Sequence, residues 1–249
     1  MEPFLFVTDL DYTLVGDKES LEHLNTELEK HRKTYGTKVV YATGRSLTLY
    51  KKLVAEESLI LPDALITSVG TEIYLDAKTY KLDSEWSEKL SFGWNRSFIT
   101  EIVQKYPELV PQQLSEQGPF KASYLIGEKD AVKILPLLKS ELEKNSLKFN
   151  LIYSGGKDLD ILPLHADKGL AVKFLQQKWE VDSQKTVVCG DSGNDIALFN
   201  AGEQRGIIVG NARPELLEWY NANLTEYRYL AQASYAAGIL EGLQYFNFI

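Results

Sequence analysis

The sequence has very little cysteine, since Cys189 is the only one among 249 residues. A single thiol can form neither a disulfide framework nor a thiolate metal site, so we expect a reducing, cytoplasmic location. No stretch approaches 18 consecutive apolar residues, and the N-terminus runs directly into a strand pattern instead of a signal peptide. We therefore expect an unprocessed, soluble protein without a membrane span.

Basic residues are in the minority, with 27 Lys and Arg against 35 Asp and Glu and a net charge of -8. Nucleic acids and anionic membranes recruit basic surfaces, so neither is expected as a partner. An anionic small molecule would have to find a local cluster of Lys and Arg. The 44% hydrophobic and 25% charged residues are ordinary for a globular protein, which argues against disorder.

The stretch FLFVTDLDYTL, at 4–14, is the pattern around which the chain is organised. Its apolar start suits a strand buried on both faces of a parallel sheet, and Asp9 and Asp11 follow at the carboxyl end, where open α/β sheets bind ligands. Asp9 can attack phosphorus without a base, and a nearby Mg²⁺ would reduce the repulsion between anions. Asp11 could protonate the leaving oxygen and then deprotonate water. Without further motifs, a DxD pair after a strand more often forms a turn and caps a helix.

Thr43 and Gly44 follow the next predicted strand, 38–42. A hydroxyl, a permissive backbone and the positive end of a helix over 46–55 would make a small phosphate cradle. For these residues alone, a helix cap and a turn is the more common explanation.

Two later clusters also lie at predicted element ends. Lys168 falls in the first turn of a helix over 168–179, where a cation is unfavourable, which suggests a nearby anion. A strand over 185–189 ends in GDSGND, whose acids and amide are hard oxygen ligands suited to Mg²⁺.

The middle of the chain reads as a separate unit. From about 79 to 164, short strands at 120–126, 148–153 and 158–162 accompany an amphipathic helix at 131–144, which predicts an α+β insertion with a small antiparallel sheet. We predict an α/β fold, with a doubly wound parallel-sheet core at 1–78 and 165–249 and an inserted α+β cap domain at 79–164.

Aromatic residues outside these motifs have structural interpretations. His23 and His31 lie on a predicted helix over 18–33, and we expect both to be solvated. For Trp86 and Trp94, packing between the cap and the core is favoured over stacking on a sugar.

The order and spacing of the four clusters resemble the haloacid dehalogenase-like (HAD) phosphotransferases. DLDYT matches the DxDxT loop of that family, Thr43 its hydroxyl motif, Lys168 its lysine and GDSGND its acidic motif. The position of the insertion corresponds to a C2-type cap. Similarity to the sucrose-phosphate phosphatases of cyanobacterial type extends over nearly the whole chain, through YATGRS, SVGTEIY, SGGKDLDILP, CGDSGNDIALF, NARPELLEWY and AGILEGLQYFNF.

This resemblance implies Mg²⁺-dependent hydrolysis of sucrose 6-phosphate, the final step of sucrose biosynthesis, through an aspartyl-phosphate. Asp9 would be the nucleophile and Asp11 the general acid and base. The implied metal ligands are Asp9, Asp191 and the backbone carbonyl of Asp11. The implied phosphate ligands are Thr43, Gly44, Lys168 and Asn194. The implied sugar ligands are Gly70, Thr71, Glu72, Lys121, Ser154, Lys157 and Asp158.

Two alternatives stay open at this point. Another sugar phosphate, such as mannosylglycerate phosphate, would use the same core chemistry, because selectivity lies in the cap. A non-catalytic sugar-phosphate-binding domain is disfavoured, because Asp9 and Asp11 are both present. Neither GxSxG nor GxGxxG follows a strand, which argues against a serine hydrolase and a dinucleotide enzyme. We expect a monomer, and the order of the pathway would allow a transient contact with sucrose-phosphate synthase.

Overall fold

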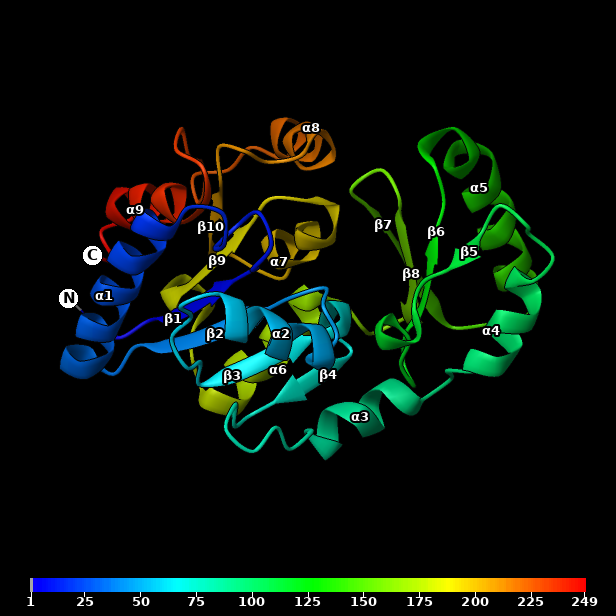
Figure 1. Cartoon of the computed structure of the whole chain (residues 1–249), viewed down its shortest axis with the longest axis horizontal. Helices are drawn as coiled ribbons and strands as arrows, with labels where there is room; N and C mark the ends of the chain where they lie inside the picture. Colours follow the sequence, from blue (N-terminus) through cyan, green and yellow to red (C-terminus); the bar gives the residue numbers. More distant parts are fainter. Residues whose placement is uncertain (1) are drawn as a thin grey trace.

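The computed structural model describes residues 2–249 and shows two units side by side, with both termini on the side of the larger unit away from the smaller one (Figure 1). The larger unit contains a seven-stranded sheet, here called the core sheet, in the order β11-β10-β9-β1-β2-β3-β4. All neighbouring pairs are parallel except β3 and β4. The strands are β1 (Leu5–Thr8), β2 (Lys38–Ala42), β3 (Ala64–Thr67), β4 (Glu72–Tyr74), β9 (Thr186–Gly190), β10 (Arg205–Ile208) and β11 (Arg228–Leu230).

Helices cover both faces of the core sheet. Alternate residues of the first strand segment enter different clusters: Phe6 packs with α1, α2 and α9, whereas Val7 packs with α6, α7 and α8. This two-sided burial explains the continuous apolar run at the start of the chain. The helices are α1 (Lys18–Tyr35), α2 (Leu47–Glu56), α6 (Lys168–Trp179), α7 (Ile196–Asn200), α8 (Pro214–Ala222) and α9 (Tyr235–Tyr245).

The register of the core sheet brings three strand ends together. In β1, Thr8 lies opposite Tyr41 of β2 on one side and Cys189 of β9 on the other. The residues that follow these three strands therefore meet at one edge, as expected for an open parallel sheet.

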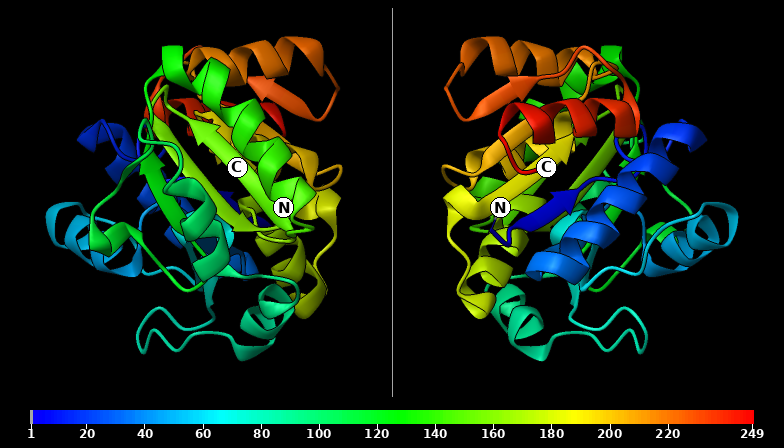
Figure 2. Two further views of the ribbon diagram at one scale, coloured as in Figure 1. Left: turned by 90° about the vertical axis from the view of Figure 1, so that its right-hand side faces the viewer. Right: turned by 90° about the vertical axis from the view of Figure 1, so that its left-hand side faces the viewer.

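The smaller unit contains a four-stranded antiparallel sheet, here called the cap sheet, in the order β5-β6-β8-β7. Figure 2 (left) shows α5 across its outer face, where Leu138 and Leu142 pack against Ile161 of β8. The elements are α4 (Arg96–Val103), β5 (Val110–Pro111), β6 (Ala122–Leu125), α5 (Glu128–Lys144), β7 (Phe149–Ser154) and β8 (Asp158–Pro163). Short 3-10 turns occur at η1 (Ser68–Gly70), η2 (Leu114–Glu116), η3 (Ser183–Lys185) and η4 (Gly193–Asp195).

The predicted fold class, a doubly wound parallel sheet with an inserted α+β unit, is confirmed. The domain boundaries at 79 and 164 stay a prediction. Within that range, α3 (Ser84–Ser91) packs on the core, because Trp86 is buried against Phe174 and donates from Nε1 to the Gly70 carbonyl at 3.0 Å. None of the helices in residues 2–249 is long and apolar enough to cross a membrane.

The expectation that His31 is solvated is wrong. Its side chain is buried, with the ring centroid 4.9 Å from that of Phe4 and Nδ1 2.7 Å from the hydroxyl oxygen of Thr37. Burial lowers the pKa of His31, so the ring is held neutral in the core. His23, on the same helix, is exposed as expected.

Candidate active site

A buried ion triad lies directly after β1. The Lys168 ammonium donates to Oδ1 of Asp9 at 2.6 Å and to Oδ1 of Asp195 at 2.7 Å, and its side chain is fully buried. Burial alone would lower the pKa of Lys168, but the two carboxylates outweigh it and raise that pKa. The lysine therefore stays charged. The sequence predicted one anion near this helix start, and the structure has two, the carboxylates of Asp9 and Asp195.

Close backbone packing positions Lys168 at the start of α6. Asp167 caps the helix by accepting from the Leu170 amide at 2.7 Å. Gly70 adopts a φ of +94°, and a Cβ on it would lie 2.3 Å from the Asp167 carbonyl. The absence of a side chain at Gly70 thus lets η1 contact the beginning of α6.

Asp195 binds Lys168 and also stabilises the turn after β9. Its Oδ2 accepts from the backbone amides of Asp191 and Ser192, both at 3.1 Å. Since Oδ1 is bound to Lys168, both oxygens of Asp195 are engaged within the protein. The sequence places Asp195 in the acidic GDSGND cluster, but we did not predict its role as the partner of Lys168.

Three buried carboxylates cluster at this sheet edge. Oxygen atoms of Asp9, Asp191 and Asp195 lie within 4.8 Å of one another. Burial, and then the charge of Asp195, raises the pKa of Asp191 to about 7. Burial raises the pKa of Asp9 well above its usual range; Lys168 opposes this shift, and the two other carboxylates add to it. Such a cluster favours a bound cation in addition to the lysine.

Asp11 is held by an arginine. Nε and an Nη of Arg45 donate to the two carboxylate oxygens of Asp11, each at 2.7 Å. This bidentate geometry fixes the carboxyl plane more firmly than a lysine would. Arg45 follows Thr43-Gly44 directly, so its position in the sequence could have indicated a cation at this strand end.

A cavity of about 500 Å³ opens between the core and the cap. Its walls combine core residues predicted to bind metal and phosphate with cap residues predicted to bind the sugar. From the core, the cavity is lined by Asp9, Asp11, Gly44, Asp191 and Asn194; from the cap, it is lined by Lys121, Ser154, Lys157 and Asp158.

The remaining predicted residues do not line this cavity. Thr43 is fully buried beneath it, as is Lys168, which reaches the site through Asp9. Thr71 is buried and donates to the Ser68 carbonyl. The Glu72 carboxylate already accepts from the hydroxyl groups of its neighbours Thr67, Ser68 and Tyr74. Because Gly70, Thr71 and Glu72 serve local packing here, their role as sugar ligands stays a prediction.

The cap side of the cavity contains a charged cluster around Lys121. Nζ of Lys121 is buried and lies 3.1 Å from the Gly44 carbonyl, 3.4 Å from Glu116 and 3.5 Å from Asp160. Sequence reasoning missed Glu116 and Asp160, as well as Gln112, which donates to Asp158 at 3.0 Å.

Arg213 was also missed, on the core side of the cavity. Its guanidinium lies 5.2 Å from the ring centre of Tyr12, and both residues line the wall. Arg213 adds a cation near Asp191 and Asn194, where an anionic substrate would arrive.

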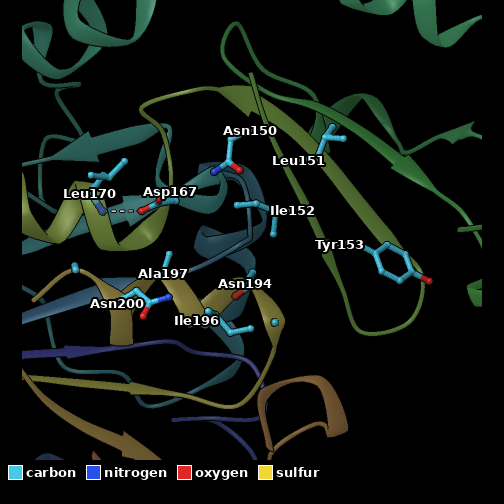
Figure 3. Close-up of a pocket in the computed structure, with 12 residues that line it drawn as sticks. Asn150, Leu151, Ile152, Tyr153, Asp167, Leu170, Asn194, Ile196, Ala197 and Asn200 are labelled. Carbon is cyan, nitrogen blue, oxygen red and sulfur yellow. Dashed lines mark hydrogen bonds between the residues drawn. The ribbon is translucent and has the colours of Figure 1, made fainter. Parts of the chain in front are cut away.

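A second cavity, of about 430 Å³, separates β7 from α6 and α7 (Figure 3). Figure 3 shows Asn150 and Ile152 on the side of β7 that faces these core elements, whereas Tyr153 points away. Asn194 lines both cavities, and its Oδ1 is buried without a hydrogen-bond partner in residues 2–249. A buried acceptor of this kind calls for a ligand or an ordered water.

Comparison with protein families gives one consistent match. The family model described as sucrose-6F-phosphate phosphohydrolase matches residues 2–247. Sucrose-phosphatase 1 of Nicotiana tabacum is 39% identical over 251 residues, covering 98% of this chain. The probable sucrose-phosphatase 3a of Arabidopsis thaliana is 37% identical over 253 residues. The chain spans 59% of the length of each of these two plant relatives.

Two further similarities cover nearly the whole length of both chains. The mannosylfructose-phosphate phosphatase of Agrobacterium fabrum is 30% identical, covering 99% of this chain and 98% of that protein. The structure of the sucrose-phosphatase from Synechocystis sp. in complex with sucrose and phosphate has 39% identity and a TM-score of 0.92, covering 99% of each chain. A HAD-like hydrolase of Bacillus subtilis, with 18% identity and a TM-score of 0.69, shares the fold.

Proposed function

The chain belongs to the sucrose-6F-phosphate phosphohydrolase family, and from this membership we propose that it is a Mg²⁺-dependent phosphatase that hydrolyses sucrose 6-phosphate to sucrose and phosphate. The family resemblance inferred from the motifs is thereby confirmed. The observation that carries the proposed activity is that Asp9 and Asp191 of the core line the same cavity as Lys121 and Lys157 of the cap. The structural similarity to a phosphatase that binds sucrose and phosphate supports the substrate.

The donor set fits Mg²⁺. Asp9 and Asp191 are buried carboxylates with oxygen atoms close enough to share one ion, and oxygen is the ligand that Mg²⁺ prefers. Both oxygens of Asp195 are already hydrogen-bonded within the protein, which leaves Asp9 and Asp191 as the carboxylate ligands. The family resemblance adds the backbone carbonyl of Asp11 to this set. When bound, Mg²⁺ would neutralise charge on the carboxylates and the phosphate.

The reaction needs two in-line displacements at phosphorus. A carboxylate oxygen of Asp9 forms a bond to phosphorus while the bond to the sugar oxygen breaks. That oxygen takes a proton from Asp11, which for this step must be protonated on one oxygen and keep only its other oxygen bound to Arg45. Water then attacks the aspartyl-phosphate, Asp11 takes the water proton, and the Asp9 carboxylate is regenerated. Lys168 holds Asp9 in place, and Arg45 orients Asp11.

Thr43, Gly44, Lys168 and Asn194 would stabilise the transferring phosphoryl group. Positioning and electrostatics dominate such transfers, so groups that are fixed before the reaction contribute most. Gly44 and Asn194 already face the cavity, whereas Thr43 and Lys168 lie beneath it. In the cap, Lys121, Ser154, Lys157 and Asp158 offer the donors and acceptors that sugar hydroxyls require.

A second candidate substrate is mannosylfructose phosphate, because the relative named for it aligns over almost its whole length. The two disaccharides present different hydroxyl geometry to the cap. A site that hydrogen-bonds hydroxyls rejects a mismatched sugar strongly, so we expect kcat/KM for sucrose 6-phosphate to exceed that for mannosylfructose phosphate by about a hundredfold.

Initial rates of phosphate release test this preference, measured with both disaccharide phosphates and with glucose 6-phosphate at one Mg²⁺ concentration. Glucose 6-phosphate serves as the control that contains a single sugar ring. Equal kcat/KM values for the three would keep the core chemistry and overturn the substrate assignment.

The remaining assignments are also proposals. We propose a core at 1–78 and 165–249, a cap at 79–164, a monomeric state and a cytoplasmic location. The low cysteine content supports a reducing compartment. A transient contact with sucrose-phosphate synthase would follow from the order of the pathway.

A further inference from the structure

Glu215, at the start of α8, connects the core to the cap. Its Oε1 accepts a hydrogen bond from the Gly155 amide at 3.0 Å and one from the Gly193 amide at 3.4 Å. Gly155 lies in the turn between β7 and β8 of the cap, and Gly193 lies in η4 of the core. One carboxylate oxygen thus bridges two backbones that are distant in the sequence.

The meeting point is closely packed. A Cβ on Gly193 would lie 3.1 Å from Cγ of Glu215 and 3.2 Å from the Tyr153 carbonyl of β7. Figure 3 shows the end of β7 facing the segment that carries Asn194. Because Gly193 has no side chain, η4, the start of α8 and the end of β7 can pack closely together. An incidental hydrogen bond at the surface would not need such close packing.

The cap turn presents its amide through an uncommon backbone conformation. Gly155 and Gly156 have φ values of +59° and +69°, a region that residues with a side chain rarely adopt. A carboxylate is the strongest side-chain acceptor for amides exposed in this way. A glutamine at 215 would keep an acceptor oxygen without the charge, whereas an alanine would leave both amides without this partner.

Both bonded segments carry residues of the cavity. Ser154 and Lys157 flank Gly155 in the cap turn, and Asp191 and Asn194 surround Gly193 in the core. A displacement of the cap turn would therefore move sugar-binding groups relative to phosphate-binding groups. Across the cavity, Nζ of Lys121 in the cap donates to the Gly44 carbonyl of the core, so the contact made by Glu215 is separate from the one on the opposite wall.

We propose that Glu215 is a positioning residue, which holds the β7–β8 turn of the cap against the η4 turn of the core and so sets the distance between the sugar and phosphate subsites. The kinetic part of this inference rests on the proposed function. The structural part, that Glu215 holds the Gly155 and Gly193 amides together, is independent of which substrate the protein hydrolyses.

The test compares Glu215→Ala and Glu215→Gln with Glu218→Ala. Glu218 lies three residues later on the same helix, is exposed, and makes no side-chain hydrogen bond within residues 2–249. Amide hydrogen exchange, measured by NMR, should become about tenfold faster at Gly155 and Gly193 in Glu215→Ala. Glu215→Gln should lie between Glu215→Ala and the parent, and Glu218→Ala should match the parent.

Kinetics with two substrates separate positioning from general damage. Glu215→Ala should raise KM for sucrose 6-phosphate about tenfold. It should change kcat/KM for p-nitrophenyl phosphate, which has no sugar to place in the cap, by less than about twofold. Equal losses with both substrates, or exchange rates at both glycines that match Glu218→Ala, would overturn the inference. If the parent does not hydrolyse sucrose 6-phosphate, the proposed function fails, and amide exchange still decides the role of Glu215.

Discussion

Replacing Asp9 by asparagine should lower kcat for sucrose 6-phosphate by at least about a thousandfold while the fold stays intact. The amide has nearly the same shape as the carboxylate but cannot attack phosphorus. Stability should not fall much, because the change removes one of three mutually repelling buried carboxylates, and Lys168 keeps its bond to Asp195.

Phosphate release and urea unfolding, measured on the same samples, check this result. Asp182→Asn is the matched control, because Asp182 is an exposed acid of the core remote from the cavity lining. If the Asp9→Asn protein kept more than a few per cent of the parent rate, Asp9 would not be the nucleophile.

Replacing Lys168 by methionine should destabilise the protein by about 3–5 kcal/mol, in addition to abolishing turnover. The side chain is fully buried between Asp9 and Asp195, so its loss leaves two buried carboxylates without their counterion. Methionine has a similar length and is apolar, so the effect reports the lost charge more than a lost volume.

Urea unfolding of Lys168→Met is best compared with that of Lys173→Met, an exposed position on the same helix. Adding Asp195→Asn to Lys168→Met should recover part of the stability, since one of the unpaired charges disappears. A loss of less than about 1 kcal/mol in Lys168→Met would mean that the ion triad contributes little to the fold.

The convergence of the main motifs could be predicted from the sequence because it depends on strand ends alone. Apolar runs located β1, β2 and β9, and a parallel sheet brings residues after such strands to one edge. The observed register, with Thr8 between Tyr41 and Cys189, places Asp9 and Asp191 there. The unfavourable position of Lys168 at a helix start also indicated its anionic partners correctly.

Side-chain contacts between distant segments could not be predicted in this way. The pairing of Arg45 with Asp11 depends on where a long side chain points, and no periodicity encodes that. Glu215 reads as an ordinary first-turn acid of α8, yet it bonds a cap amide 60 residues earlier in the chain. His31 was misjudged from its polar side chain, because its spacing of three from Leu28 already places it on the buried face of the helix, next to Phe4.

The central claim is that this cavity hydrolyses sucrose 6-phosphate with Mg²⁺ held by Asp9 and Asp191. Its most direct test is the rate of phosphate release from sucrose 6-phosphate, measured with Mg²⁺, with excess chelator, and after Mg²⁺ is restored. We predict release that is lost on chelation, returns with Mg²⁺, and needs a much higher Mg²⁺ concentration in Asp191→Asn. Release that persists with chelator, or none from sucrose 6-phosphate under any condition, would contradict it.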